Sequence, residues 1–311
     1  MKPARDNFAG ALAMGDLNRR QFGARAAALG LSLPAAGAMM TGASAQVADS
    51  PRTVKFPDGT IVPALGQGSW HLGQGRHPLD MEIEAMRTGI GLGLTVIDTA
   101  ESYGEGKSEK FLGKAIAGLR DKVFLVSKVS EPSVNDHDIE RACDRSLARL
   151  GTTYLDLYLL HTPVAAGYNP YVVATFEKLR AAGKIKNWGV SNHDVHQTEL
   201  VFKVPGGDKC ATNQVPYALN NRYPEPEILP WCVAHNMPIM AYSPLGGDNR
   251  LLVGDKTLAQ LGAQHGCSAS AVALAWVMRS GNVIAIPESG DPAHVKENAA
   301  AASIRWIPAT P

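Results

Sequence analysis

The sequence predicts an α/β protein whose fold is a (β/α)8 TIM barrel with an N-terminal β-hairpin. Eight apolar, strand-like runs alternate with segments whose apolar residues recur three or four positions apart, which is the period of a helix. Strands that alternate with helices through short connections form a parallel sheet, and eight such repeats match the barrel. The strand-like runs lie at residues 64–68, 94–98, 123–128, 155–161, 185–191, 211–214, 238–243 and 283–287.

A doubly wound sheet is the second candidate for this alternation. Such a sheet usually carries a G-x-G-x-x-G loop after its first strand, where the backbone approaches a pyrophosphate. The corresponding stretch, residues 66–71, has glycines at 66 and 68 but no third glycine at the required spacing. The barrel is therefore the preferred fold.

The N-terminal residues differ in composition from the rest of the chain. Arg19 and Arg20 precede an apolar, Ala-rich stretch, and residues 43–45 then match an A-x-A cleavage pattern. This order is typical of an export signal, and paired arginines favour the twin-arginine route. An ordinary Ala-rich helix is the alternative. We expect a signal peptide at 1–45 that the twin-arginine export machinery recognises, a barrel at 46–311, and a periplasmic or secreted product without stable membrane insertion.

Local patterns predict the remaining elements. Two short β-prone runs flank Asp58-Gly59, which is typical of a hairpin turn. Residues 268–279 are Ala-rich and evenly apolar, like a buried helix. Apolar positions with helical spacing are Ile83, Met86 and Ile90; Ile139, Cys143, Leu147 and Leu150; and Val172, Phe176 and Leu179.

The composition excludes several classes of protein. With 45% hydrophobic and 19% charged residues, a chain of 311 residues can bury a sizeable core. The net charge of +1 provides no case for a nucleic-acid partner. Cys143, Cys210, Cys232 and Cys267 are widely spaced without C-x-x-C, so neither a metal site nor a dense disulfide framework is predicted. We predict buried thiols, and a disulfide in an oxidising compartment stays open.

Four polar side chains follow adjacent predicted strands, at the end of the barrel where active sites form. Asp98 and Tyr103 follow the second strand, Lys128 ends the third and His161 ends the fourth. A Lys128 cation would lower the pKa of Tyr103 from about 10, and Asp98 would keep that lysine charged. His161 would orient a substrate oxygen, so Tyr103 would protonate a carbonyl during hydride addition. Each residue also has a structural alternative. Asp98 and Lys128 could form a structural ion pair, Tyr103 could pack in a loop, and His161 could be a hydrogen-bonded core histidine.

Side chains on the next strands suggest a nicotinamide site. Asn192 follows the fifth strand, Gln214 ends the sixth and Tyr242 lies near the end of the seventh. An Asn or Gln amide has both a donor and an acceptor, as a carboxamide requires, and a tyrosine offers a flat face for the ring. The alternative is a set of polar loop residues with one core aromatic.

Six short motifs support a specific family. They are Asp98-Thr99-Ala100-x-x-Tyr103-Gly104, Lys128, Leu159-Leu160-His161, Gly189-Val190-Ser191-Asn192, Asn213-Gln214 and Tyr242-Ser243-Pro244-Leu245. On these motifs the chain resembles the aldo-keto reductase family from about residue 54 to 298. Bacterial methylglyoxal-reductase-like members are more similar still, through residues 67–70 and 230–232.

The resemblance implies NAD(P)H-dependent reduction of an aldehyde or ketone to an alcohol. The catalytic tetrad would be Asp98, Tyr103, Lys128 and His161, with Tyr103 as the proton donor. Trp70 would border the pocket of a small-molecule carbonyl substrate. The residues implied to bind the cofactor, NADPH or NADH, are Ser191, Asn192, Gln214, Tyr242, Ser243, Leu245, Glu288, Ser289, His294 and Asn298.

Two features depart from the family pattern, which usually has Pro-Lys-Ser/Thr after the eighth strand and an arginine five residues beyond. Here Glu288 precedes Ser289, and His294 replaces the arginine, while Glu297 and Asn298 still match and Asn298 would read the adenine. A carboxylate disfavours a 2′-phosphate and could accept a hydrogen bond from a ribose 2′-OH, so we expect a weakened preference for NADPH and use of NADH. Alternatively, Glu288 points to solvent and neighbours compensate. The chain's end at residue 311 predicts a shortened C-terminal tail and a more open pocket.

Two other functions stay open on this fold. Lys128 could serve as the Schiff-base amine of a lyase, although the nearby Asp98 would keep it charged. A non-catalytic, cofactor-binding regulatory subunit is the other alternative, because a fold does not determine a function.

Overall fold

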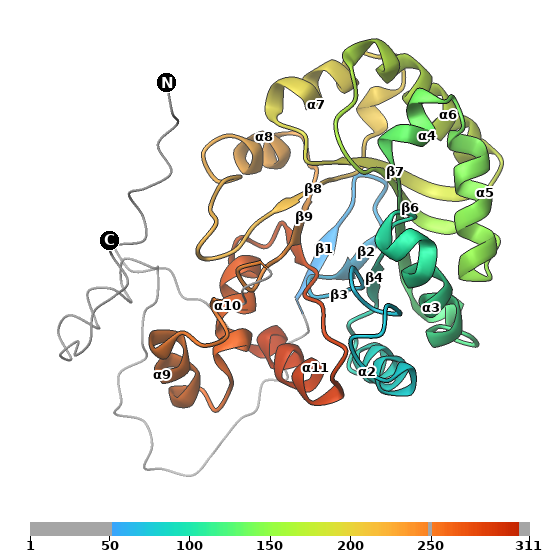
Figure 1. Cartoon of the computed structure of the whole chain (residues 1–311). Helices are drawn as coiled ribbons and strands as arrows, with labels where there is room; N and C mark the ends of the chain where they lie inside the picture. The colour runs from blue at the N-terminus through green and yellow to red at the C-terminus, as the bar shows by residue number, and fades with distance from the viewer. Residues whose placement is uncertain (1–51, 248–250, 305–311) are drawn as a thin grey trace, which may run out of the picture. The chain divides into compact units, whose positions relative to one another are not determined.

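Eight parallel strands form the central sheet of the computed structural model, which describes residues 52–247 and 251–304 (Figure 1). The strands stand in chain order, so each one pairs with its successor along the sequence. Every predicted run overlaps an observed strand, and the (β/α)8 barrel is confirmed. The strands are β3 (Gln67–Gly68), β4 (Val96–Asp98), β5 (Phe124–Val129), β6 (Leu155–Leu160), β7 (Ile185–Ser191), β8 (Asn213–Pro216), β9 (Ile239–Tyr242) and β10 (Val283–Ala285).

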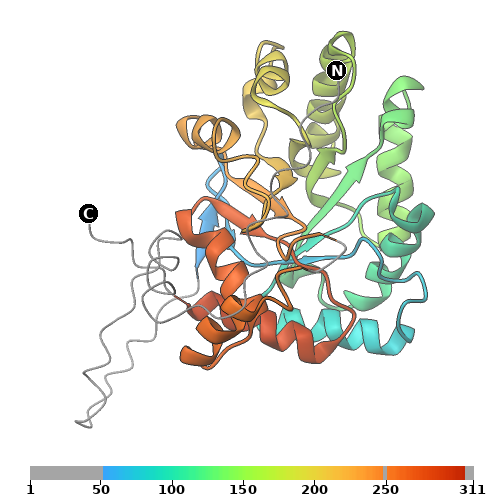
Figure 2. The same ribbon diagram turned by 60° about the vertical axis from the view of Figure 1, so that its left-hand side comes forward.

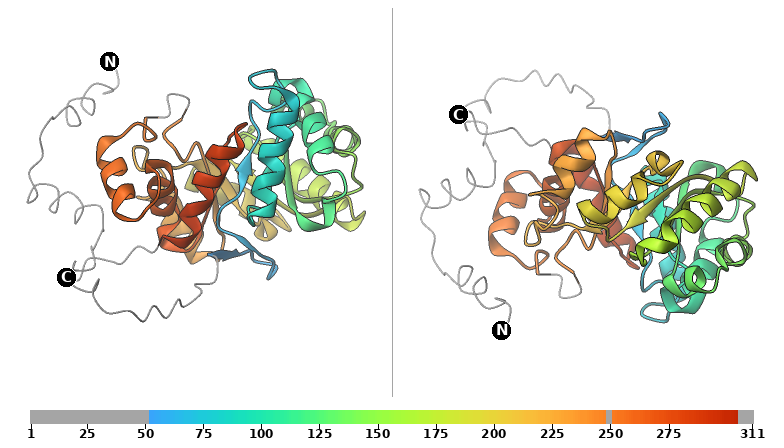
Figure 3. Two further views of the ribbon diagram at one scale, coloured as in Figure 1. Left: turned by 90° about the horizontal axis from the view of Figure 1, so that it is seen from below. Right: turned by 90° about the horizontal axis from the view of Figure 1, so that it is seen from above.

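The first and last strands of the sheet, β3 and β10, close it into a barrel. The backbone N–H of Gly66 donates to the carbonyl of Ala285 at 2.8 Å, and that of Gly68 donates to Pro287 at 2.9 Å. A parallel bridge also joins Gly68 to Glu288. The helices α2 and α11 lie side by side along the same seam (Figure 3). Closure therefore places the loop after β3 directly against the loop after β10.

Helices cover the outside of the barrel (Figures 1 and 2). They form where apolar residues recur at helical spacing, because that spacing gives each helix one apolar face for the strands. In α10 all residues are buried, in agreement with its evenly apolar sequence. The helices are α2 (Leu79–Gly91), α3 (Lys107–Ala115), α4 (Glu131–Asn135), α5 (Ile139–Leu150), α6 (Asn169–Ala181), α7 (Val195–Phe202), α8 (Ile228–Ala234), α9 (Lys256–Gln264), α10 (Ala269–Val277) and α11 (Pro292–Ala299).

The predicted N-terminal hairpin is present, as β1 (Thr53–Lys55) and β2 (Ile61–Pro63). Asp58 in its turn accepts hydrogen bonds from the backbone of Thr60 at 2.9 Å and from the side chain of Asn187 in β7 at 2.8 Å. Buried Phe56 stacks on Phe124 at the start of β5, with 5.3 Å between ring centroids. The hairpin therefore packs at the amino-terminal end of the barrel, opposite the end that carries the predicted site.

The strands read as nearly continuous apolar runs because both faces of a parallel barrel are covered. All residues of β6 are buried, for example. Three cysteines, Cys143, Cys210 and Cys232, are buried free thiols, and burial raises each pKa to about 12. This confirms the prediction of buried thiols for these three; Cys267 is also free but only half-buried.

Three predictions fall on residues outside those that the structure describes. They are the signal peptide at 1–45, the start of the barrel domain at 46, and the shortened tail at the C-terminal end. Within residues 52–247 and 251–304, no helix combines the length and apolar character that crossing a bilayer requires. The same residues contain no group of three or more His, Cys, Asp and Glu side chains arranged to hold a metal ion.

Candidate active site

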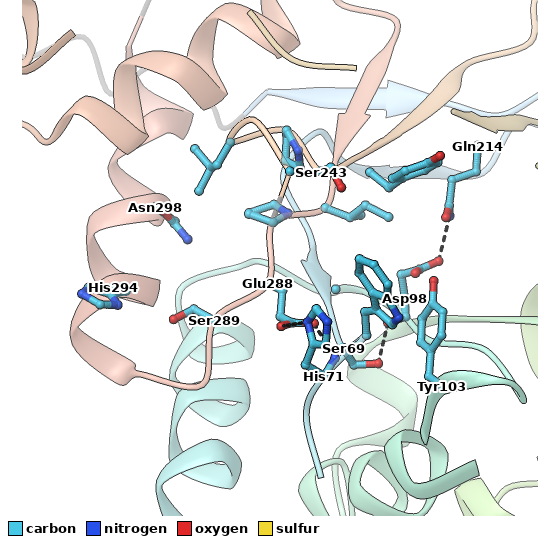
Figure 4. Close-up of a pocket in the computed structure, with 18 of the residues that line it drawn as sticks. Ser69, His71, Asp98, Tyr103, Gln214, Ser243, Glu288, Ser289, His294 and Asn298 are labelled. Carbon is cyan, nitrogen blue, oxygen red and sulfur yellow. Dashed lines mark hydrogen bonds and ion pairs between the residues drawn. The ribbon is translucent and has the colours of Figure 1, made fainter. Parts of the chain in front are cut away.

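A cavity of about 500 Å³ opens at the carboxyl end of the barrel strands, the size of an ordinary small-molecule site. All predicted site residues line it except Lys128, which lies behind its wall. In Figure 4, Asp98, Tyr103 and Gln214 stand at one end, Ser289, His294 and Asn298 at the other, and His71 and Glu288 between them. The strand ends therefore bring together residues from across the whole barrel, as predicted.

Lys128 joins Asp98 and Tyr103 into one hydrogen-bonded group. Its Nζ donates to Asp98 Oδ2 at 2.7 Å, to the carbonyl of Thr99 at 2.8 Å and to the Tyr103 hydroxyl at 3.0 Å. Asp98 ends β4 and Lys128 lies in the paired strand β5, so the sheet itself sets their separation. The Lys128 side chain is fully buried and its three protons have three acceptors. Such a group is costly to break, at roughly 3–5 kcal/mol for loss of one charged partner.

The local sequence around Tyr103 explains its position. Tyr103 begins a 3-10 turn that ends at Gly106 and leads directly into α3. Gly104 and Gly106 have φ angles of 55° and 84°, in the left-handed region that glycine adopts at least cost. This turn holds the phenol at the end of β4 and over Lys128.

Charge and burial act in opposite directions on the two proton-bearing groups. Burial lowers the pKa of Lys128, but the Asp98 carboxylate and Tyr103 together outweigh it, so that pKa is raised and the amine stays charged. For Tyr103, burial raises the pKa and is only partly offset by Lys128, so the net shift is upward. The expected lowering of the Tyr103 pKa is therefore wrong, because desolvation of the phenolate is the larger effect. The tyrosine keeps its proton at neutral pH and can donate it.

His161 is a neutral imidazole beside the phenol. Burial, followed by the nearby Lys128 charge, lowers its pKa to about 3. Its Nδ1 lies 3.3 Å from the Ser102 hydroxyl, and its ring meets that of Tyr103 edge-on at 5.6 Å. The Asn192 side chain donates to its backbone carbonyl at 3.0 Å. A neutral, well-oriented imidazole can hydrogen-bond a carbonyl oxygen without adding a charge.

The predicted carboxamide-binding residues form a connected amide network. Gln214 Nε2 donates to Asp98 Oδ1 at 2.8 Å, which links this network to the Lys128 group (Figure 4). The Tyr242 hydroxyl donates to Asn192 Oδ1 at 2.9 Å, and the Ser191 hydroxyl donates to the backbone carbonyl of Gln214 at 2.9 Å. These contacts fix the orientation of each amide before any ligand is considered.

The backbone of this network includes two unusual conformations. Asn192 and Ser243 have φ angles of 62° and 51°, in the left-handed region that only asparagine and few other side chains tolerate well. Both residues directly follow a barrel strand and line the cavity. Such strain is common at functional sites, where it aims side chains that a relaxed backbone would turn away.

Glu288 is held by His71 rather than directed at solvent. The backbone N–H of His71 donates to Oε2 at 2.7 Å, and the ring Nδ1 lies 2.9 Å from Oε1. Both carboxylate oxygens therefore already have a donor. The alternative in which Glu288 points to solvent is therefore wrong, whereas the expected weakening of the preference for NADPH stays a prediction.

Several lining residues were not predicted from the sequence. His71 and Ser102 follow the first and second strands closely, so their position near strand ends was a usable signal. Arg76 lies farther along the loop between β3 and α2, where no local pattern marks a binding residue. The unpredicted polar residues that line the cavity are Ser69, His71, Arg76, Ser102 and Ser270.

The lining residues fit a nicotinamide dinucleotide. One end of the cavity combines amide groups with a half-buried tyrosine, and next to it stands a proton donor. Ser191, Asn192, Gln214 and Tyr242 would hold the nicotinamide there, and Ser289, His294 and Asn298 would contact the adenosine part at the other end. Such a cofactor supplies a hydride next to the proton donor, and the two together reduce a carbonyl.

Comparison with known proteins gives consistent results. The model of the aldo/keto reductase family matches residues 64–308. Methylglyoxal reductase YeaE of Escherichia coli (strain K12) is 46% identical over 252 residues, covering 80% of this chain and 88% of that protein. Glyoxal reductase of Bacillus subtilis (strain 168) is 33% identical over 250 residues, covering 79% of this chain and 86% of the relative.

Solved structures with the same fold carry the cofactor. An aldo-keto reductase from Klebsiella pneumoniae in complex with NADPH is 43% identical, with a TM-score of 0.79, and the match covers 82% of this chain and 91% of that one. A second structure from the same organism, in complex with NADP and acetate, is 42% identical with a TM-score of 0.77 and the same coverage.

Proposed function

The chain belongs to the aldo/keto reductase family and is an NAD(P)H-dependent carbonyl reductase, and we propose that its substrate is a small α-oxoaldehyde of the methylglyoxal type. The relatives named as methylglyoxal and glyoxal reductases support this substrate class. The observation that carries the catalytic role is the Tyr103 hydroxyl 3.0 Å from the buried Lys128 ammonium, at the wall of the cavity.

The proposed roles follow from the geometry. Tyr103 donates its proton to the carbonyl oxygen while the carbonyl carbon accepts a hydride from the bound nicotinamide, and the product is an alcohol. Lys128 stabilises the tyrosinate that remains, because its charge lies at hydrogen-bond distance from the oxygen. Asp98 holds Lys128 in its charged form, and neutral His161 orients the carbonyl oxygen by donating a hydrogen bond. The tyrosinate then takes a proton from solvent.

The surroundings of Tyr103 favour a small substrate. Trp70 is 47% exposed, and its ring centroid lies 6.5 Å from that of Tyr103, so it forms an apolar wall beside the proton donor. The His161 ring meets the same phenol edge-on, with 5.6 Å between ring centroids. A short dicarbonyl compound can place one carbonyl between His161 and Tyr103 and rest its remaining atoms against Trp70.

The other candidate reactions gain no support from the geometry. A Schiff-base lyase needs a neutral lysine that reaches the substrate, whereas Lys128 is charged, fully buried and surrounded by three acceptors. A non-catalytic role would leave the proton-donor geometry without a purpose.

Turnover of a carbonyl panel tests the proposal. Methylglyoxal, glyoxal, a simple aldehyde and a bulky aromatic ketone are each offered with NADPH and with NADH, and oxidation of the cofactor is followed by the loss of its near-ultraviolet absorbance. We expect the highest kcat/KM for the two small dicarbonyls. A preference for the bulky ketone would overturn the substrate class, and absence of turnover on the whole panel would favour the non-catalytic alternative.

We further propose that the chain is exported by the twin-arginine route to the periplasm or beyond. The support is the order of Arg19-Arg20, an apolar stretch and the small residues at 43–45. Because this route carries folded proteins, the cofactor can travel bound to the barrel. The test is fractionation of cells that express the wild-type chain or the double variant Arg19→Lys, Arg20→Lys. Equal amounts of mature protein outside the cytoplasm for both would contradict the proposal.

A further inference from the structure

The charge of the cavity lining raises a question about how it accepts a phosphate-bearing cofactor. Three acidic side chains, Asp98, Glu288 and Glu297, line the cavity. Asp98 is paired with Lys128, and Glu288 is bonded to His71. Among the described residues of the lining, Arg76 is the one arginine or lysine. On the described part of these walls, a ligand with several negative charges therefore meets a single permanent cation.

The loop that carries Arg76 is held against the loop after β10 at two points. At its start, His71 bonds to Glu288 through both its backbone and its ring. Toward its end, the ring of His77 lies so close to Gly290 that a Cβ on this glycine would be 2.6 Å from it. Arg76 directly precedes His77, so its backbone is placed beside the turn that follows Ser289.

A third contact stabilises the middle of the loop. Buried Glu82 of α2 accepts a hydrogen bond from the backbone N–H of Gly73 at 2.8 Å. The loop is thereby tied both to the helix that follows it and to the opposite side of the barrel seam. A side chain on such a loop is presented at a defined place, which is what recognition of one phosphate requires.

The Arg76 side chain itself is exposed and available. Neither a hydrogen bond nor an ion pair involves its guanidinium anywhere in the part of the chain that the structure describes. Arg76 lines the cavity, and its neighbour in sequence, His77, packs against Gly290, one residue after Ser289. Ser289 lies at the adenosine end of the cavity, together with His294 and Asn298 (Figure 4).

We propose that Arg76 binds the 2′-phosphate of NADPH and so replaces the cations that are missing at Glu288 and His294. A guanidinium can donate two parallel hydrogen bonds to a phosphate and stays charged at all relevant pH values. The charge that distinguishes NADPH from NADH is then recognised from the β3–α2 loop instead of from the loop after β10. This inference rests on the use of a nicotinamide cofactor, but it does not depend on the substrate.

Equilibrium binding without any carbonyl substrate tests the inference. NADPH and NADH are titrated into wild-type protein and Arg76→Ala by fluorescence quenching, and adenosine 2′,5′-bisphosphate and AMP serve as fragments that differ only in the 2′-phosphate. Loss of a charge-assisted phosphate contact corresponds to about tenfold to hundredfold in Kd. We expect such a loss for NADPH and for the bisphosphate, and less than twofold for NADH and AMP.

Two further variants separate phosphate recognition from general effects. Arg76→Lys keeps the charge but not the paired donors, so its Kd for NADPH should lie between those of wild type and Arg76→Ala. Lys110→Ala removes an exposed charge on α3 that does not line the cavity, and it should change neither Kd. Equal losses for NADPH and NADH in Arg76→Ala, or no loss for NADPH, would overturn the inference. Because turnover is not measured, failure of the proposed reaction would leave this test intact.

Discussion

Replacement of Tyr103 by phenylalanine isolates the proton donor from the rest of the site. The substitution removes one hydroxyl and keeps the ring, which packs edge-on against His161 and beside Trp70. Lys128 loses one of its three acceptors but retains Asp98 at 2.7 Å and the carbonyl of Thr99 at 2.8 Å. The buried ammonium therefore keeps its counter-charge, and the surrounding structure has no reason to rearrange.

The expected sizes of the two effects differ strongly. Loss of one hydrogen bond from a charged group that keeps its other partners costs about 1–2 kcal/mol of folding free energy, or a few degrees in Tm for a domain of this size. Loss of a positioned general acid costs about 10²- to 10⁴-fold in rate, which corresponds to about 3–5 kcal/mol in activation free energy. We therefore expect kcat to fall by at least a hundredfold while the Kd for NADPH changes by less than threefold.

The assay is steady-state reduction of methylglyoxal, together with cofactor titration and thermal unfolding of the same preparation. Tyr158→Phe is the matched control, because its hydroxyl is buried without a hydrogen-bond partner and lies in β6 away from the cavity. Removal of that hydroxyl should leave kcat unchanged and Tm unchanged or slightly higher. A Tyr103→Phe enzyme with more than a tenth of wild-type kcat would refute Tyr103 as the proton donor.

Three further predictions concern neighbouring groups. Gln214→Leu leaves Asp98 Oδ1 without its donor and should destabilise the fold by about 1–3 kcal/mol in urea titrations, and an unchanged midpoint would show that this hydrogen bond contributes nothing. Because burial and Lys128 lower the pKa of His161 from 6.5 to about 3, the unfolded chain binds a proton between these values that the folded chain does not. Stability should thus fall as pH drops through this window, less steeply in His161→Gln, and an NMR titration that finds a protonated His161 at pH 5 would contradict it. Partial burial raises the pKa of Glu177. Hydrogen bonds from Arg180, Lys209 and Trp188 outweigh this effect and lower the pKa from 4.5 to about 2. The contribution of Glu177 to folding stability is present above pH 4.5 and is lost toward pH 2. In acid denaturation, the stability difference between wild type and Glu177→Gln should therefore shrink over that range, and a constant difference would contradict this prediction.

Much of the fold was predictable because its signals are local. The apolar run of β6 and the helical spacing of Ile139, Cys143, Leu147 and Leu150 each depend on a few neighbouring residues, since burial on one or both faces imposes a period on the sequence. The ends of the strands were less accurate. β3 is only Gln67–Gly68, although the apolar run begins at 64, because the earlier part joins β10 through single backbone contacts and not through a regular ladder.

The catalytic group was predictable for a related reason. In a parallel barrel all strands end on the same side, so Asp98, Lys128 and His161 had to meet once their strands were recognised. The prediction for the Tyr103 pKa failed, because it counted the Lys128 charge, which a sequence reveals, and omitted desolvation, which depends on every atom packed around the phenol.

By itself, the sequence determined the order of strands and helices and the residue types at the strand ends, because both follow from short-range periodicity. Only the tertiary structure decided what those residues contact across the seam of the barrel. Glu288 appeared from the sequence to be a charge misplaced against a phosphate, yet it is bound by His71, 217 positions earlier in the chain. No sequence pattern marks Arg76 as a binding residue. Its place at the cavity becomes evident only from the closed barrel, which brings its loop beside Ser289 and Gly290. Contacts of this kind depend on how the first and last strands pair, and no local pattern contains that information.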